Sequence, residues 1–143
     1  MFKIGVGPSS SHTLGPWKVA LQWLQNLQQQ MPLQAVEGLE VHLFGSLALT
    51  GRGHATDVAV IMGLLNQQPE TVETEQVPVL VQLLRQSGEL VLGGRHPVPF
   101  RPKEHIIFHF DKALDFHANG MQLRAFGQGK VFEETWYSIG GGF

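Results

Sequence analysis

Apolar residues recur at every third or fourth position over residues 17–31, while glutamine, asparagine and lysine occupy the opposite face. This spacing predicts an amphipathic helix that begins near Pro16 and ends before Pro32. Apolar and polar residues alternate over 39–44, which predicts a half-buried strand. The nearly continuous apolar run over 58–66 then predicts a second, deeply buried helix.

The rest of the chain carries shorter patterns. Residues 67–76 are polar, whereas leucines share one face of a third predicted helix over 77–86. The proline-rich run 93–102 predicts an extended connector. Three strand-like segments follow, the last two joined by a hairpin turn at 127–129, and they cover residues 105–110, 121–126 and 131–138. This order of elements predicts an α+β fold, with a mixed sheet and helices on one side of it.

Composition narrows the class of protein. A chain of 143 residues forms one domain that needs no disulfide or metal to fold. It has no cysteine, which excludes disulfides, a cysteine nucleophile and an iron–sulfur cluster held by thiolates of this chain. A formal charge of -2 provides no basic surface for nucleic acid or an anionic membrane. The longest apolar run is too short to span a bilayer and no signal peptide is recognisable, so we expect a cytoplasmic protein.

Few charges lie along the chain. Charged residues make up 15% of it, against about 25% in typical domains. A surface that faces another protein would explain this deficit, and an ordinary surface rich in glycine and glutamine is the alternative. The sequence runs directly into a glycine loop at its start and has no polar tail after Tyr137. We therefore expect a domain of a longer protein.

Five polar side chains follow a Gly-Pro pair directly before the first predicted helix: Ser9, Ser10, Ser11, His12 and Thr13. Hydroxyls and unpaired backbone N–H groups at the positive end of a helix can bind a carboxylate or a phosphate. A dinucleotide fingerprint would need glycine at position 10, and the Gly-Lys-Ser/Thr of a Walker loop is absent, so neither nucleotide site fits. A helix cap without a ligand is the alternative.

A histidine lies in a loop bracketed by glycines, at the start of the second helix. The imidazole of His54, with an ordinary pKa of about 6.5, suits proton abstraction at neutral pH. Thr50 in the same loop is a candidate supporting residue. Asp57 is another, because it can cap the helix, orient the imidazole, or do both. A loop histidine that only bonds the backbone is the alternative.

A third group of polar residues lies between two predicted strands. His117 and Asn119, followed by Gly120, can together bind a carboxylate and an ammonium group, although Asn-Gly is above all a turn signal. His105 and His109 would be about 13 Å apart on one strand, too far to share a metal ion. No metal site is predicted.

Four separated motifs resemble, in their order along the whole chain, the β domain of bacterial iron–sulfur L-serine dehydratases. Four motifs together are far more specific than any one of them. The family has glycine where Ala55 stands and proline where Ala118 stands, and both differences are small. The motifs are Gly-Pro-Ser-Ser-Ser-His-Thr at Gly7–Thr13, the histidine loop at Gly45–Asp57, His-Ala-Asn-Gly-Met at His117–Met121, and Tyr-Ser-Ile-Gly-Gly-Gly-Phe at Tyr137–Phe143.

This resemblance implies part of a lyase, L-serine ammonia-lyase, which converts L-serine to pyruvate and ammonia without pyridoxal phosphate. A helical catalytic domain of the same protein would follow, and its cysteines would ligate a four-iron, four-sulfur cluster that acts as a Lewis acid on the substrate hydroxyl. The present chain would bind no cofactor and would be inactive alone. The resemblance further implies a homo-oligomer, and a fold like the allosteric substrate-binding domain of certain phosphoglycerate dehydrogenases.

The resemblance also implies roles for individual residues. His54 would be the base that removes the α-proton of L-serine, and Ser9 to Thr13 would bind its carboxylate. A second, activating serine would bind at His117, Asn119 and Gly120. The alternative is a purely regulatory module that binds serine and contributes no catalytic residue.

Overall fold

Helices and strands alternate irregularly along the chain. The computed structural model describes residues 14–45, 55–109 and 119–137. The elements in order are α1 (Leu14–Gln30), the 3-10 helix η1 (Leu33–Ala35), β1 (Gly38–Gly45), α3 (Ala55–Leu64), α4 (Gln76–Ser87), β2 (Glu89–Leu92), β3 (His96–Pro99), α5 (Pro102–His105), β4 (Ile106–His109), β5 (Asn119–Gly127) and β6 (Lys130–Tyr137).

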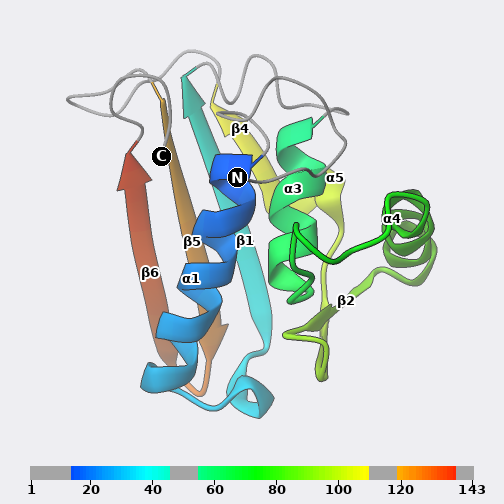
Figure 1. Ribbon diagram of the computed structural model, residues 1–143. Coiled ribbons are helices and arrows are strands. Elements are labelled where there is room, and N and C mark those ends of the chain that lie inside the picture. The colour runs from blue at the N-terminus through cyan, green and yellow to red at the C-terminus, as the bar shows by residue number, and fades with distance from the viewer. Residues whose placement is uncertain (1–13, 46–54, 110–118, 138–143) are drawn as a thin grey trace.

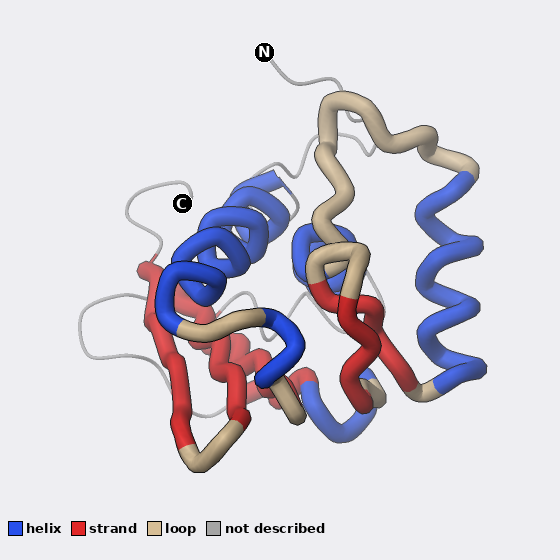
Figure 2. The backbone as a smooth tube through the Cα atoms, turned by 90° about the horizontal axis from the view of Figure 1, so that it is seen from below, coloured by secondary structure: helices blue, strands red, loops and turns tan. Residues whose placement is uncertain are grey.

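One sheet organises the molecule. Its four strands lie in the order β4-β1-β5-β6, with β4 parallel to β1 and the other neighbours antiparallel. The helices α1 and α3 cover one face of this sheet, and α4 stands beside the β2–β3 hairpin, on the side away from β6 (Figures 1 and 2). The predicted α+β fold, a mixed sheet with helices on one side, is therefore confirmed.

The core lies between the sheet and the two covering helices. Because side chains alternate along a strand, one face of β1 and β5 can be fully apolar. Their six inward residues are at most 3% exposed, and α1 and α3 pack on them with side chains that are at most 2% exposed. Burial of each leucine, isoleucine, valine or methionine side chain stabilises the fold by about 1.5–3 kcal/mol. The inward residues are Leu39, Val41, Leu43, Met121, Leu123 and Ala125, covered by Trp17, Trp23, Leu24, Leu27, Val60, Ile61, Met62 and Leu64.

The region predicted as an extended connector is more ordered than expected. Two strands, β2 and β3, form an antiparallel hairpin there, with Gly93 and Gly94 at positive φ in its turn. Pro97 and Pro99 have no backbone N–H to donate, so a strand was not expected there. Because the sheet has only two strands, one edge of β3 is unpaired, and prolines are tolerated on such an edge strand. The prediction of an extended connector was therefore wrong for residues 96–99, which form β3. The strand predicted to start at residue 105 starts at Ile106, because His105 is the last residue of α5.

The long helices match their periodic patterns. The helix predicted over 77–86 spans Gln76–Ser87 and ends at Gly88, whose left-handed φ of 71° closes the last turn through a bond to the Leu84 carbonyl. In the part of the chain that the structure describes, no helix combines the length and apolar character needed to cross a membrane.

Candidate functional site

Most of the residues that sequence analysis assigned to a site lie outside the described part of the chain. Asp57, Asn119 and Gly120 are described, and so are the residues that flank each motif. The candidates outside the described residues are Ser9, Ser10, Ser11, His12, Thr13, Thr50, His54 and His117. Their roles stay predictions.

The flanks of the motifs meet at one end of the sheet. In the ladders, Phe44 pairs with His109, Gly45 pairs with Asn119, and Gly120 pairs with Tyr137. The last residues of β1, β4 and β6 and the first residue of β5 therefore lie side by side. We call this edge, defined by Gly45, His109, Asn119 and Tyr137, the motif end of the sheet.

Two helices begin at the motif end. In Figure 1, α1 and α3 both begin toward the end of the sheet at which β1, β4 and β6 end. The first N–H groups of a helix have no partner within it and carry a partial positive charge, which favours an anion there. Thr13 directly precedes the first residue of α1, and His54 directly precedes the first residue of α3. In the sequence, each candidate segment thus ends directly before the first described residue of a helix.

Asp57 lies in the first turn of α3 and is 6% exposed. Its Oδ1 accepts a hydrogen bond from the backbone N–H of Val58 at 2.9 Å. A carboxylate at this position satisfies a helix N–H and interacts favourably with the positive helix end. Both roles considered for Asp57, capping the helix and orienting His54, stay predictions.

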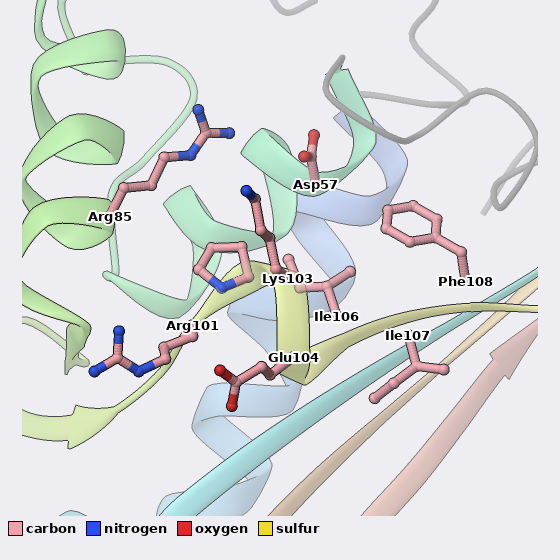
Figure 3. Close-up of a pocket in the computed structure, with 9 residues that line it drawn as sticks. Asp57, Arg85, Arg101, Lys103, Glu104, Ile106, Ile107 and Phe108 are labelled. Carbon is pink, nitrogen blue, oxygen red and sulfur yellow. The ribbon is translucent and has the colours of Figure 1, made fainter.

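A cavity of about 970 Å³ lies between α3, α4, α5 and β4 (Figure 3). Asp57 contributes a carboxylate to it, Arg85 and Lys103 contribute cations, and Ile106 and Phe108 contribute apolar surface. In Figure 3, the charged ends of Asp57, Arg85 and Lys103 point toward the same space. Such an arrangement can bind a small molecule that carries both a carboxylate and an ammonium group. Neither Arg85 nor Lys103 belongs to a motif, so no sequence signal identified them as candidates.

Asn119 and Gly120 form the start of β5. Both pair in the ladder with β1, and Gly120 is buried. The Asn-Gly pair was a candidate turn, and that interpretation is wrong because neighbouring strands fix both residues in an extended conformation. Asn119 thus stands at the motif end, next to Gly45.

The two histidines considered for a metal site are not on one strand. His105 ends α5, where its Nδ1 accepts the backbone N–H of Arg101 at 2.8 Å, and His109 ends β4. The assumed spacing along a strand was therefore wrong. Among the residues of known placement, no three histidine, aspartate or glutamate side chains are arranged to hold a metal ion.

Comparison with known proteins identifies the family. A family model described as serine dehydratase beta chain matches residues 1–143. The chain is 46% identical to L-serine dehydratase TdcG and 44% identical to L-serine dehydratase 1, both of Escherichia coli K12, and 41% identical to the L-serine dehydratase of Streptomyces coelicolor. Each alignment covers 100% of this chain and 32% of the relative, so the chain spans about a third of those proteins. The chain belongs to the serine dehydratase beta chain family.

Proposed function

We propose that this chain is the β part of an L-serine dehydratase, a lyase that converts L-serine to pyruvate and ammonia. One observation carries the proposal: the described flanks of all four motifs converge on the motif end of the sheet. The relatives named L-serine dehydratase extend over about three times the length of this chain. We assign the remaining part of the enzyme to the other side of a shared active site, facing the motif end.

The chemistry assigned to this chain is binding and proton transfer. The hydroxyls of Ser9, Ser10 and Ser11 and the start of α1 hold the substrate carboxylate. A ring nitrogen of His54 takes the α-proton, the bond between the β-carbon and the hydroxyl oxygen breaks, and the departing hydroxide takes up one proton to leave as water, which yields aminoacrylate. Its imine tautomer then adds water and releases ammonia and pyruvate. Asp57 fixes the first turn of α3, directly after His54, and thereby positions that base.

An iron–sulfur cluster does not fit the residues of this chain. Thiolates are the usual ligands of such clusters, and the sequence contains no cysteine. The part of the chain with known placement also lacks a group of three alternative ligands. We therefore assign the four-iron, four-sulfur cluster to the part of the enzyme that lies outside this chain.

Replacing Ser9, Ser10 and Ser11 together by alanine in the complete enzyme should raise the KM for L-serine at least about tenfold. Each lost hydrogen bond to a charged group costs about 1.5–3 kcal/mol, and 1.4 kcal/mol corresponds to a factor of ten. Steady-state pyruvate formation measures this change. Ser87→Ala is the matched control, because its hydroxyl only bonds backbone groups at the end of α4. An unchanged KM in the triple variant would contradict the carboxylate site.

A second candidate function is allosteric binding of serine at His117, Asn119 and Gly120. The observation that favours it is the fixed position of Asn119, whose backbone pairs with Gly45 at the motif end. Asn119→Ala should raise the serine concentration for half-maximal activation at least about threefold, through loss of a hydrogen bond of roughly 1 kcal/mol. The maximal rate should stay unchanged, because the ladder does not need the amide side chain. Serine dependence identical to that of the wild type would remove this site.

A further inference from the structure

The cavity between α3, α4, α5 and β4 collects positive charge that the proposed function does not use (Figure 3). Three of the ten basic residues of the chain line it, Arg85, Arg101 and Lys103, and we call them the cavity cations. The described lining contains two acidic residues, Asp57 and Glu104. In a chain of which only 15% is charged, the lining thus gathers an excess of positive charge.

Arg85 and Lys103 reach the cavity from two elements that are tied to each other. Arg85 lies in the last turn of α4, and Lys103 lies in the single turn α5. The backbone N–H of the buried Phe100 donates to the Gly88 carbonyl at 2.8 Å, which joins the segment before α5 to the end of α4. In Figure 3, the two charged ends point into the same space. The backbone positions from which both cations extend are therefore fixed before any ligand binds.

Arg101 adds a third cation at the same end of α4. Its guanidinium lies against Gly88, since a Cβ on that glycine would stand 3.1 Å from the guanidinium carbon. Gly88 caps α4 about one helical turn after Arg85. The negative end of α4 stabilises a cation there, which accounts for Arg85 and Arg101. It does not account for Lys103, which comes from a different element and faces the same space.

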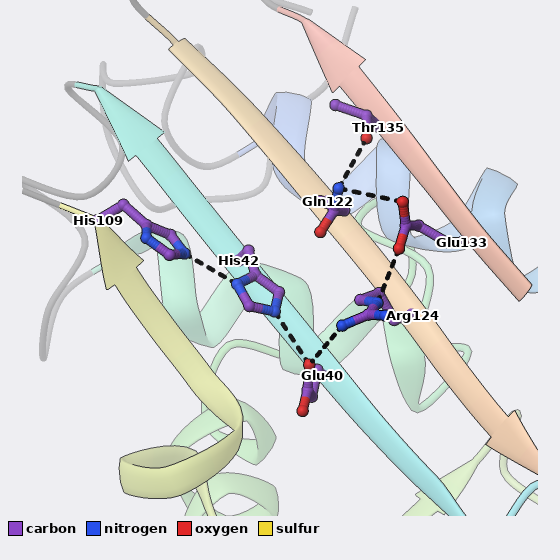
Figure 4. Close-up of polar contacts among 7 residues, drawn as sticks. All are labelled: Glu40, His42, His109, Gln122, Arg124, Glu133 and Thr135. Atoms are coloured by element: carbon purple, nitrogen blue, oxygen red, sulfur yellow. Dashed lines mark hydrogen bonds and ion pairs between the residues drawn. The ribbon is translucent and has the colours of Figure 1, made fainter. Parts of the chain in front are cut away.

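The cavity cations form no ion pair with the described residues. Figure 4 shows where the ion pairs of those residues lie: they join His42, Glu40, Arg124 and Glu133 across the strands of the sheet, away from the cavity. None of them involves a cavity cation. A guanidinium fork and an ammonium group donate their strongest hydrogen bonds to anions. An anion that enters the cavity therefore finds donors that the described residues leave unused.

We propose that this cavity binds the carboxylate of a small organic acid that carries no ammonium group. The planar fork of Arg85 donates to both carboxylate oxygens, and the ammonium group of Lys103 donates to one of them. The remainder of the acid lies against the apolar surface of Ile106, which also lines the cavity. The volume of about 970 Å³ falls within the range of small-molecule sites.

The charges of the lining select this class of ligand. Three cations against two carboxylates leave one positive charge in excess. One of the carboxylates, Asp57, also accepts the backbone N–H of Val58 at 2.9 Å, beside the positive start of α3. An acid without an ammonium group neutralises the excess charge. L-Serine has no net charge at neutral pH and leaves it in place.

Titration of the 15N-labelled 143-residue chain with succinate, followed by NMR, tests the site. Succinate, an acid without an ammonium group, should shift the amide signals of Arg85 and Lys103 in a saturable way at millimolar concentrations. Arg85→Gln and Lys103→Gln should each raise the dissociation constant about tenfold, because each removes charged hydrogen bonds. Both side chains are exposed, so neither substitution should disturb the fold.

Arg95→Gln is the matched control, because it removes the same charge from an exposed arginine that donates to Gln28 Oε1 at 2.6 Å. This variant should keep the dissociation constant of the wild type for succinate. L-Serine at the same concentrations should leave the Arg85 and Lys103 signals unshifted. The proposal is overturned if succinate causes no saturable shift, if Arg95→Gln weakens binding as much as Arg85→Gln, or if L-serine binds at these residues as tightly as succinate.

Discussion

Gly63→Ala should lower the free energy of unfolding by about 2 kcal/mol. Gly63 lies in α3 where this helix crosses α1, and a Cβ there would stand 2.5 Å from the Ala20 Cβ and 2.8 Å from the Trp17 carbonyl oxygen. The two helices would have to separate, and overpacking of this kind costs about 1–3 kcal/mol, occasionally more. Alanine is itself the better helix former by about 1 kcal/mol, so a net loss can only come from the contact with α1. Chemical denaturation followed by circular dichroism measures this change in the free energy of unfolding.

Gly38→Ala is the matched control for this prediction. A Cβ on Gly38 would meet only the Phe126 Cδ2 atom, at an ordinary 3.8 Å. We expect the free energy of unfolding to change by less than about 0.5 kcal/mol there. Equal effects of the two substitutions would show that the close contact between α1 and α3 does not limit stability. Since both helices begin at the motif end, their separation should also reduce activity of the complete enzyme.

Regular periodicity made most of the fold predictable from sequence. The amphipathic pattern before Pro32 predicted α1, and the apolar run after Asp57 predicted α3. Both patterns were visible because a helix that covers a sheet needs an apolar face toward it. The β2–β3 hairpin was missed because its strands are four residues long and β3 contains two prolines. The single turn α5 has too few residues to show any period.

Contacts between distant residues could not be predicted in the same way. His42 and His109 are 67 positions apart, and only the parallel pairing of β1 with β4 makes them neighbours. Arg85 and Lys103 share a cavity with Asp57 through packing between elements, which no local pattern encodes. The motifs identified the candidate site, but the convergence of their flanks depends on the order β4-β1-β5-β6. The likeness to the phosphoglycerate dehydrogenase domain stays a prediction.

The largest effect on activity is expected from His54→Ala. A general base typically contributes about 10²- to 10⁴-fold to the rate, so kcat for L-serine should fall at least about 100-fold. The KM should change little, because the carboxylate is assigned to Ser9, Ser10 and Ser11 rather than to the imidazole. Added imidazole should restore part of the rate by acting as a free base. His96→Ala is the matched control, since that side chain bonds the Val36 carbonyl and belongs to no motif.

Pyruvate release by the complete enzyme shows whether this chain supplies the proton-accepting residue of an L-serine dehydratase. Wild type, His54→Ala and His96→Ala should be compared at saturating L-serine, with equal iron and sulfide content confirmed in all three. We expect turnover to fall at least about 100-fold for His54→Ala alone. Turnover of His54→Ala close to that of the wild type would contradict it.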